Sequence, residues 1–216
     1  MDTAFARRQM VRQQVRTSDV FDPDILRVLS DLERGAFVPT RYADLAYADT
    51  RIPLPNGQRM MTPTVEGRLL QALRPEAGER VLEVGTGSGF LTACLARMAD
   101  SVVSVDIFGD LLAMASRNLE TAGIANVDLL SMDVTATLPD EQFDAVAVTA
   151  SLPEFDMRFV DALKPGGRLF VIVGDPPVMQ ARLVVRQATG ELSGTSLFET
   201  CIAPLVNAER DSEFEF

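Results

Sequence analysis

The chain has 216 residues, of which 47% are hydrophobic, and its formal net charge is −11 at pH 7. This length and composition predict one globular domain and exclude a disordered chain, and no apolar run approaches the length of a membrane span. We therefore expect no membrane partner. The acidic balance disfavours nonspecific nucleic-acid binding, so we expect no nucleic-acid partner either.

The sequence contains no histidine and only two cysteines, Cys94 and Cys201. Histidine is the commonest general base and the commonest metal ligand in proteins, so we predict no metal site and a reaction that needs no imidazole. The cysteines form no motif, and the N-terminus lacks the apolar core of a signal peptide. Together these features predict a cytoplasmic location.

Charge is unevenly distributed, because residues 1–51 hold eight arginines and eight acidic residues while the rest of the chain carries the whole negative excess. An arginine-bearing N-terminal region beside an acidic domain suits an anionic acceptor. An ordinary solvated surface is an equally good interpretation.

Apolar side chains at helical spacing predict an amphipathic helix over residues 5–16. A second helix is predicted to start at Asp22-Pro23 and to end at Gly35. A loop rich in turn residues follows. The third helix starts at Thr62-Pro63 and ends before Pro75.

From there strands alternate with helices. The predicted strands cover residues 81–84, 102–106, 126–132, 143–149 and 168–174, and the predicted helices cover residues 90–98, 110–122 and 155–163. This alternation predicts an α/β fold with a mostly parallel, doubly wound sheet. Two more strands, at residues 181–187 and 196–204, are joined through Gly190 and Gly194 and predict an antiparallel edge.

The segment Arg80–Phe90 reads R-V-L-E-V-G-T-G-S-G-F and joins a buried strand to a helix through a glycine turn. Such a turn lets the backbone approach a ligand closely, and the helix N-terminus offers free N–H groups. The third glycine comes one residue earlier than in the G-x-G-x-x-G of dinucleotide-binding proteins. The segment resembles motif I of the Rossmann-like methyltransferases that use S-adenosyl-L-methionine. A glycine turn that serves packing alone is the alternative.

In such a sheet the ligand lies beyond the C-terminal ends of the strands. We therefore predict that S-adenosyl-L-methionine binds at the ends of the first four strands. The predicted cofactor-binding residues are Glu83, Gly85, Thr86, Gly87, Gly89, Asp106, Ile107, Asp133, Val134 and Thr149.

Asp106 is predicted to accept hydrogen bonds from both ribose hydroxyls, and Asp133 from the adenine amino group, with the backbone of Val134 beside the ring. A helix cap for Asp106 and plain turn chemistry for Asp133 are the alternatives. Glu83 would be costly as an unpaired buried charge, so it either orders the glycine turn or approaches the cofactor's ammonium group. Thr149 faces the methyl-donor end.

Motifs outside the glycine turn restrict the resemblance to one family of these methyltransferases. They are Met10–Arg16 (M-V-R-Q-Q-V-R), Phe37-Val38-Pro39, Ala46–Asp49 (A-Y-A-D), Ile52–Gln58 (I-P-L-P-N-G-Q), Phe143–Ala150 (F-D-A-V-A-V-T-A) and Gly166–Leu169 (G-G-R-L). Over roughly residues 10–206 the chain resembles the protein-L-isoaspartate O-methyltransferase family. The resemblance implies methylation of the free α-carboxylate of isoaspartyl residues in a protein or peptide partner, with S-adenosyl-L-homocysteine as the product. It also implies that the loop from Ala46 to Pro63 covers the cofactor and receives the peptide.

The chain departs from this family at the acceptor site. Gly57–Pro63 reads G-Q-R-M-M-T-P where the family has G-Q-T-I-S-Q-P, so Met61 replaces a serine that contacts the reacting carboxylate. Methionine cannot donate a hydrogen bond, and Arg59 and Thr62 are the nearest candidate donors. The predicted catalytic positions are therefore Arg59, Met61 and Thr62. A same-fold methyltransferase with another acceptor and a non-catalytic cofactor-binding protein stay open as interpretations.

We thus expect a Rossmann-like methyltransferase fold in a single globular domain. Residues 1–78 supply N-terminal helices and the covering loop, residues 79–206 form the cofactor-binding core with its C-terminal antiparallel edge, and residues 207–216 form an acidic tail.

Overall fold

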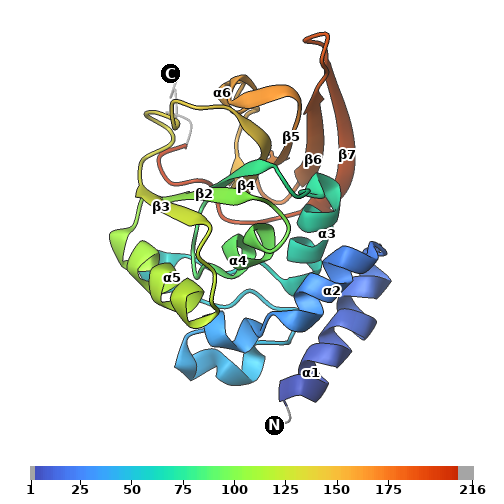
Figure 1. Ribbon diagram of the computed structural model, residues 1–216, viewed down its shortest axis with the longest axis vertical. Coiled ribbons are helices and arrows are strands. Elements are labelled where there is room, and N and C mark those ends of the chain that lie inside the picture. The colour runs from blue at the N-terminus through green and yellow to red at the C-terminus, as the bar shows by residue number, and fades with distance from the viewer. Residues whose placement is uncertain (1–2, 209–216) are drawn as a thin grey trace, which may run out of the picture.

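The computed structural model describes residues 3–208, and at its centre lies a seven-stranded sheet in the order β3-β2-β1-β4-β5-β6-β7 (Figure 1). The strands are β1 (Arg80–Val84), β2 (Ser101–Asp106), β3 (Val127–Ser131), β4 (Phe143–Leu152), β5 (Leu163–Val173), β6 (Met179–Arg186) and β7 (Leu192–Thr200). The strands β1 to β5 pair in parallel, whereas β6 and β7 pair antiparallel. The predicted mostly parallel sheet with an antiparallel C-terminal edge is confirmed.

The central strands are apolar because both faces of the sheet are covered. Successive side chains of β1 enter two different hydrophobic clusters: Val81 packs in the cluster that contains Phe170, and Leu82 in the cluster that contains Val171. This alternation is the period-two geometry of a strand that is buried on both sides. Packing on both faces holds β1 in place, and thereby also the glycine turn that follows it.

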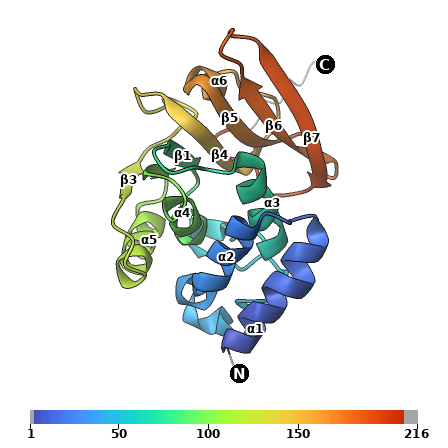
Figure 2. The same cartoon turned by 45° about the vertical axis from the view of Figure 1, so that its right-hand side comes forward.

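Helices lie on both sides of the sheet, but unequally. They are α1 (Thr3–Gln9), α2 (Pro23–Asp31), α3 (Pro63–Leu73), α4 (Phe90–Ala96), α5 (Gly109–Thr121) and α6 (Arg158–Asp161). The helices α1 to α5 gather on one side, and α6 lies on the other (Figures 1 and 2). The helix predicted over residues 155–163 is shorter in the structure, where only Arg158–Asp161 form α6. Asp156 accepts a hydrogen bond from the Arg158 backbone N–H at 2.9 Å, and the chain enters β5 at Leu163.

The N-terminal helix is not the single α-helix predicted over residues 5–16. It is α-helical as far as Gln9, and Met10–Val15 then form a π-helical turn. Because i→i+5 hydrogen bonds widen the turn, Met10 and Val15 both reach the core. The helix α2 starts as predicted, with the Asp22 carboxylate accepting from the Asp24 N–H at 2.9 Å. It ends at Asp31 rather than at Gly35.

The last strand also differs from the prediction. The strand β7 spans Leu192–Thr200 instead of residues 196–204, so Gly194 lies inside the strand. Residues 202–206, which we call the strap, leave the sheet edge and run beside the end of β4. There the Ser151 N–H donates to the Ala203 carbonyl at 3.0 Å, and the Leu205 N–H donates to the Ser151 carbonyl at 2.8 Å.

One hydrophobic cluster joins the N-terminal helices to the sheet, since it contains Leu29 and Leu69 together with Ala145 and Phe170. This shared core supports our proposal that residues 1–78 and 79–206 form one domain. The acidic tail predicted for residues 207–216 lies, after Ala208, outside the described residues. Within residues 3–208, the helices are too short or too polar to cross a lipid bilayer.

Candidate active site

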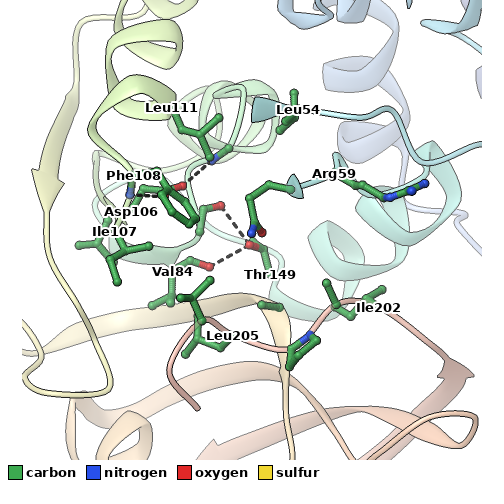
Figure 3. Close-up of a pocket in the computed structure, with 18 of the residues that line it drawn as sticks. Leu54, Arg59, Val84, Asp106, Ile107, Phe108, Leu111, Thr149, Ile202 and Leu205 are labelled. Carbon is green, nitrogen blue, oxygen red and sulfur yellow. Dashed lines mark hydrogen bonds between the residues drawn. The ribbon is translucent and has the colours of Figure 1, made fainter. Parts of the chain in front are cut away.

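A cavity of about 220 Å³ opens where β1, β2 and β4 end. Val84, Val105 and Thr149 line it from these strands, the strap closes one side, and the loop before α3 closes another. Figure 3 shows Asp106, Ile107 and Phe108 on one side of the cavity and Arg59 and Ile202 on the opposite side. The cavity is where the rule for parallel sheets places a ligand.

The glycine turn brings the backbone against the cavity. Gly85 has a φ of +95°, and a Cβ atom there would lie 2.2 Å from the Thr149 hydroxyl oxygen. That hydroxyl donates to the carbonyls of Val84, at 2.8 Å, and Gly85, at 3.0 Å. Both the conformation and the close approach require glycine at this position.

Asp106 closes β2 beside this turn. Its two carboxylate oxygens accept from the backbone N–H groups of Gly87 and Phe108, both at 3.0 Å. Burial raises the pKa of Asp106, and these two donors oppose the increase. The carboxylate therefore both holds the turn and lines the cavity, next to Ile107.

Asp133 lines the same cavity after β3, beside the buried Val134. One carboxylate oxygen accepts from the Thr135 N–H and hydroxyl, at 2.9 and 2.6 Å, and the other accepts from the Asn207 amide at 2.8 Å. Hydrogen bonds from Thr135 and then Asn207 are the main reasons why the pKa of Asp133 is lowered. The Asp133 carboxylate thus holds Asn207, the residue directly after the strap.

Glu83 is completely buried and is not among the residues that line the main cavity. Its Oε2 atom accepts from the hydroxyls of Thr92 at 2.5 Å and Ser104 at 2.6 Å, and the Ser104 hydroxyl is 2.7 Å from that of Thr86. Burial raises the pKa of Glu83 to about 8. The link from Glu83 through Ser104 to Thr86 supports the first predicted alternative, in which this glutamate orders the glycine turn. Glu83 and Thr86 border a second cavity of about 50 Å³ next to the first.

Residues 51–61, which we call the hairpin loop, cover the cavity as two extended arms. The Leu54 N–H donates to the Gln58 carbonyl at 2.8 Å, and the Met60 N–H donates to the Ile52 carbonyl at 2.9 Å. At the tip the Asn56 amide donates to Asp110 of α5 at 2.7 Å. The cavity lining from this loop comprises Arg51, Leu54, Gly57, Gln58, Arg59, Met60 and Met61.

Two predicted site residues lie outside both cavities. Thr62 caps α3: its hydroxyl accepts from the Val65 N–H at 3.4 Å and lies 3.0 Å from the Thr64 hydroxyl. Gly89 precedes α4 and packs against Ala115 of α5. The structure thus brings Arg59 and Met61 to the cavity, together with most of the predicted cofactor residues, and leaves Thr62 and Gly89 apart.

Three parts of the cavity lining were not predicted from the sequence: Arg51, the strap, and Phe108 with Leu111. The signal for the strap in the sequence is the apolar run I-A-P-L-V at Ile202–Val206, and the strand predicted over residues 196–204 includes only its first three residues. Arg51 gave no signal by itself, because its position depends on the pairing of the two arms of the hairpin loop.

A family model described as Protein-L-isoaspartate(D-aspartate) O-methyltransferase (PCMT) matches residues 6–210, nearly the whole chain. The chain belongs to this family. It is 35% identical over 207 residues to the protein-L-isoaspartate O-methyltransferase of Koribacter versatilis strain Ellin345, covering 94% of this chain and 93% of that protein. It is 39% identical over 197 residues to a second such protein, from Anaeromyxobacter sp. strain Fw109-5, covering 90% and 93%.

A solved structure from Plasmodium falciparum, a protein-L-isoaspartate O-methyltransferase in complex with S-adenosyl-L-homocysteine, shares the fold. The TM-score is 0.78 at 21% identity, with 92% of this chain and 97% of the other covered. The Rossmann-like methyltransferase fold predicted from the sequence is confirmed.

Arg34, three residues before the F-V-P motif, is completely buried. Its guanidinium makes a bidentate contact with Glu66 of α3, at 3.0 and 3.1 Å, and donates to the carbonyls of Ala46 at 3.2 Å and Met61 at 2.7 Å. Burial raises the pKa of Glu66 to about 7, although the Arg34 charge opposes that increase. Arg34 therefore holds Ala46 and Met61 in place. These two residues are the ends of a segment that contains the hairpin loop.

Proposed function

We propose that this protein transfers the methyl group of S-adenosyl-L-methionine to the free α-carboxylate of isoaspartyl residues in proteins or peptides. The observation that carries the proposal is the cavity itself, in a chain that belongs to the protein-L-isoaspartate O-methyltransferase family. Asp106 and Asp133 line it, and the Arg59 guanidinium lies across the cavity from Asp106, on the side of Ile202 in the strap.

The residues fit this cofactor. Each Asp106 oxygen accepts one backbone N–H, and a carboxylate has about four acceptor sites, so capacity remains for two ribose hydroxyls. Asp133 and Val134 stand further along the cavity, where we assign the adenine. Two carboxylates on this side would repel a pyrophosphate, which favours a sulfonium nucleoside over a dinucleotide. Gly85 keeps the wall free of a side chain.

Bound S-adenosyl-L-methionine supplies an electrophilic methyl group on a positively charged sulfur. Transfer of that methyl group to a carboxylate oxygen of the acceptor would leave the C–S bonding pair on sulfur. No proton moves, so the absence of histidine from the sequence is no obstacle. The protein's contribution is positioning and exclusion of water, to which Met61, the strap and the hairpin loop contribute apolar walls.

Of the three predicted catalytic positions, Arg59 and Met61 line the cavity. We propose that Arg59 binds the acceptor carboxylate and that Met61 forms the apolar wall beside it. Thr62 supports the site through the cap of α3.

Two matched peptides test this function, one with an isoaspartyl residue and one with a normal aspartyl residue at the same position. With labelled S-adenosyl-L-methionine, the isoaspartyl peptide is expected to yield base-labile methanol and the aspartyl peptide far less. S-adenosyl-L-homocysteine binding in calorimetry without any methyl ester would eliminate the proposal while leaving the cofactor site intact.

Asp106→Ala is expected to weaken S-adenosyl-L-methionine binding by about 1–3 kcal/mol, because it removes a charged acceptor from the ribose and a restraint from the turn. Calorimetry measures the change. Asp128→Ala is the control, since Asp128 lies on β3 outside the cavity with a side chain that is 66% exposed. Equal affinities for the Asp106 variant and the wild type would refute the ribose assignment.

Met61→Ser is expected to raise the rate of isoaspartyl methylation about fivefold, because a hydroxyl adds a hydrogen bond worth ~1 kcal/mol to the acceptor carboxylate. The assay is methyl ester formation at subsaturating peptide. Met114→Ser is the control, because Met114 is a partly buried methionine on α5 that lies outside the cavity. No gain from Met61→Ser would show that the acceptor is not held at this position.

We further propose an isoaspartyl-containing protein or peptide as the partner and a cytoplasmic location. The free thiols of Cys94 and Cys201 support a reducing compartment.

A further inference from the structure

The pairing of the hairpin loop places one more arginine at the acceptor side. Pro53 and Arg59 form an antiparallel bridge. The Met60 N–H bond to the Ile52 carbonyl follows the same register. Continued by one residue, that register would place Arg51 across from Met61. Residues that face each other across an antiparallel pair point to the same side.

Burial alternates along the first arm of the hairpin loop, whereas Met61 is buried on the same side as the two arginines. Ile52, Leu54 and Met60 are buried and point to one side. Arg51 and Arg59, both exposed, alternate with them, and both border the main cavity. Because Arg59 lies two residues before Met61, it is diagonal to Arg51, with an expected Cβ separation of roughly 7–8 Å.

Neither arginine is paired with an acid within residues 3–208. The Arg51 guanidinium donates to the Cys201 carbonyl, directly before the strap, which anchors it between the hairpin loop and the strap. The remaining N–H groups of both guanidiniums are available to a ligand. In a chain with a net charge of −11, this leaves a local positive site at the cavity.

We propose that Arg51 and Arg59 form a two-guanidinium site that selects acceptors with a second carboxylate beside the isoaspartyl α-carboxylate. The inference rests on the proposed function, and it names the preferred substrate: an isoaspartyl residue with an acidic neighbour. One guanidinium binds the reacting carboxylate where the family's serine would donate, and the other binds the neighbouring side chain.

The acceptor carboxylate changes its charge during the reaction, and a guanidinium site responds to that change. The carboxylate loses its negative charge on conversion to the methyl ester, so the guanidinium that held it binds the product less tightly than the substrate. The site therefore distinguishes acceptor from product by charge, which a serine hydroxyl does only weakly.

Two isoaspartyl peptides that differ only in having glutamate or glutamine next to the isoaspartyl residue test the proposal. For the wild type, kcat/KM is expected to be about tenfold higher for the glutamate peptide, the scale of one charged hydrogen-bonded contact. Arg51→Gln is expected to reduce that preference to less than about threefold, mainly through KM. Arg12→Gln removes an equal charge from an exposed residue outside the cavity and is expected to keep the preference.

Each outcome separates the two proposals. A wild type that methylates neither isoaspartyl peptide contradicts the proposed function. A wild type that methylates both peptides equally well overturns the two-guanidinium site and leaves the function standing. Retention of the glutamate preference in Arg51→Gln, with S-adenosyl-L-homocysteine affinity showing that the variant is folded, overturns the role of Arg51.

Discussion

Gly85→Ala is expected to weaken S-adenosyl-L-homocysteine binding by roughly 10- to 100-fold. The added Cβ atom would lie 2.2 Å from the Thr149 hydroxyl, so Thr149 must move, and its hydrogen bonds to the carbonyls of Val84 and Gly85 must break. The φ of +95° adds strain of ~1–3 kcal/mol for any side chain. Both effects distort the wall of the cavity where the cofactor enters.

Gly78→Ala is the matched control for this prediction. Gly78 has a φ of +91°, but a Cβ atom there would have no neighbour within 4 Å. The control therefore carries the same backbone strain without the collision, and it should lower stability while leaving ligand affinity within about twofold of the wild type. If the two variants bind S-adenosyl-L-homocysteine equally well, the contact with Thr149 does not shape the cofactor site.

Arg34→Ala is expected to lower the free energy of unfolding by ~3–5 kcal/mol, the usual cost of leaving one partner of a buried ion pair without the other. Glu66 would stay buried without its bidentate partner, and the carbonyls of Ala46 and Met61 would lose their donors. Chemical denaturation measures the loss. Because Met61 is fastened by Arg34, methyl transfer is expected to fall as well.

An exposed ion pair and a double variant serve as controls for this prediction. Arg27→Ala breaks a pair with Asp24 in which the arginine side chain is 68% exposed, and it should change the stability by less than about 1 kcal/mol. Arg34→Met combined with Glu66→Met should recover much of the loss, because no buried charge is left unpaired. A stability unchanged by Arg34→Ala would contradict the role assigned to the buried pair.

The parts of the site that the sequence predicted depend on local patterns. The glycine turn follows a short apolar strand, Asp106 is the last residue of β2, and Asp133 lies two residues after β3. Since the ends of adjacent parallel strands meet at one edge of a sheet, their positions along the chain were sufficient to bring them to one cavity.

The parts that the sequence did not predict depend on which distant segments pair. The strap runs beside β4 because its backbone pairs with Ser151, about fifty residues earlier in the chain. Arg51 lines the cavity because the two arms of the hairpin loop pair with each other. Thr62 is a candidate donor by its position in the sequence, and in the structure its hydroxyl caps the start of α3. Local patterns do not specify any of these pairings.

The most direct test of the whole account is a crystal structure of the protein with S-adenosyl-L-homocysteine and an isoaspartyl peptide. We expect the ribose at Asp106, the adenine between Asp133 and Val134, and the peptide's α-carboxylate beside Arg59, facing the sulfur. A nucleoside bound outside this cavity, or a peptide carboxylate on the Asp106 side of the sulfur, would contradict the account.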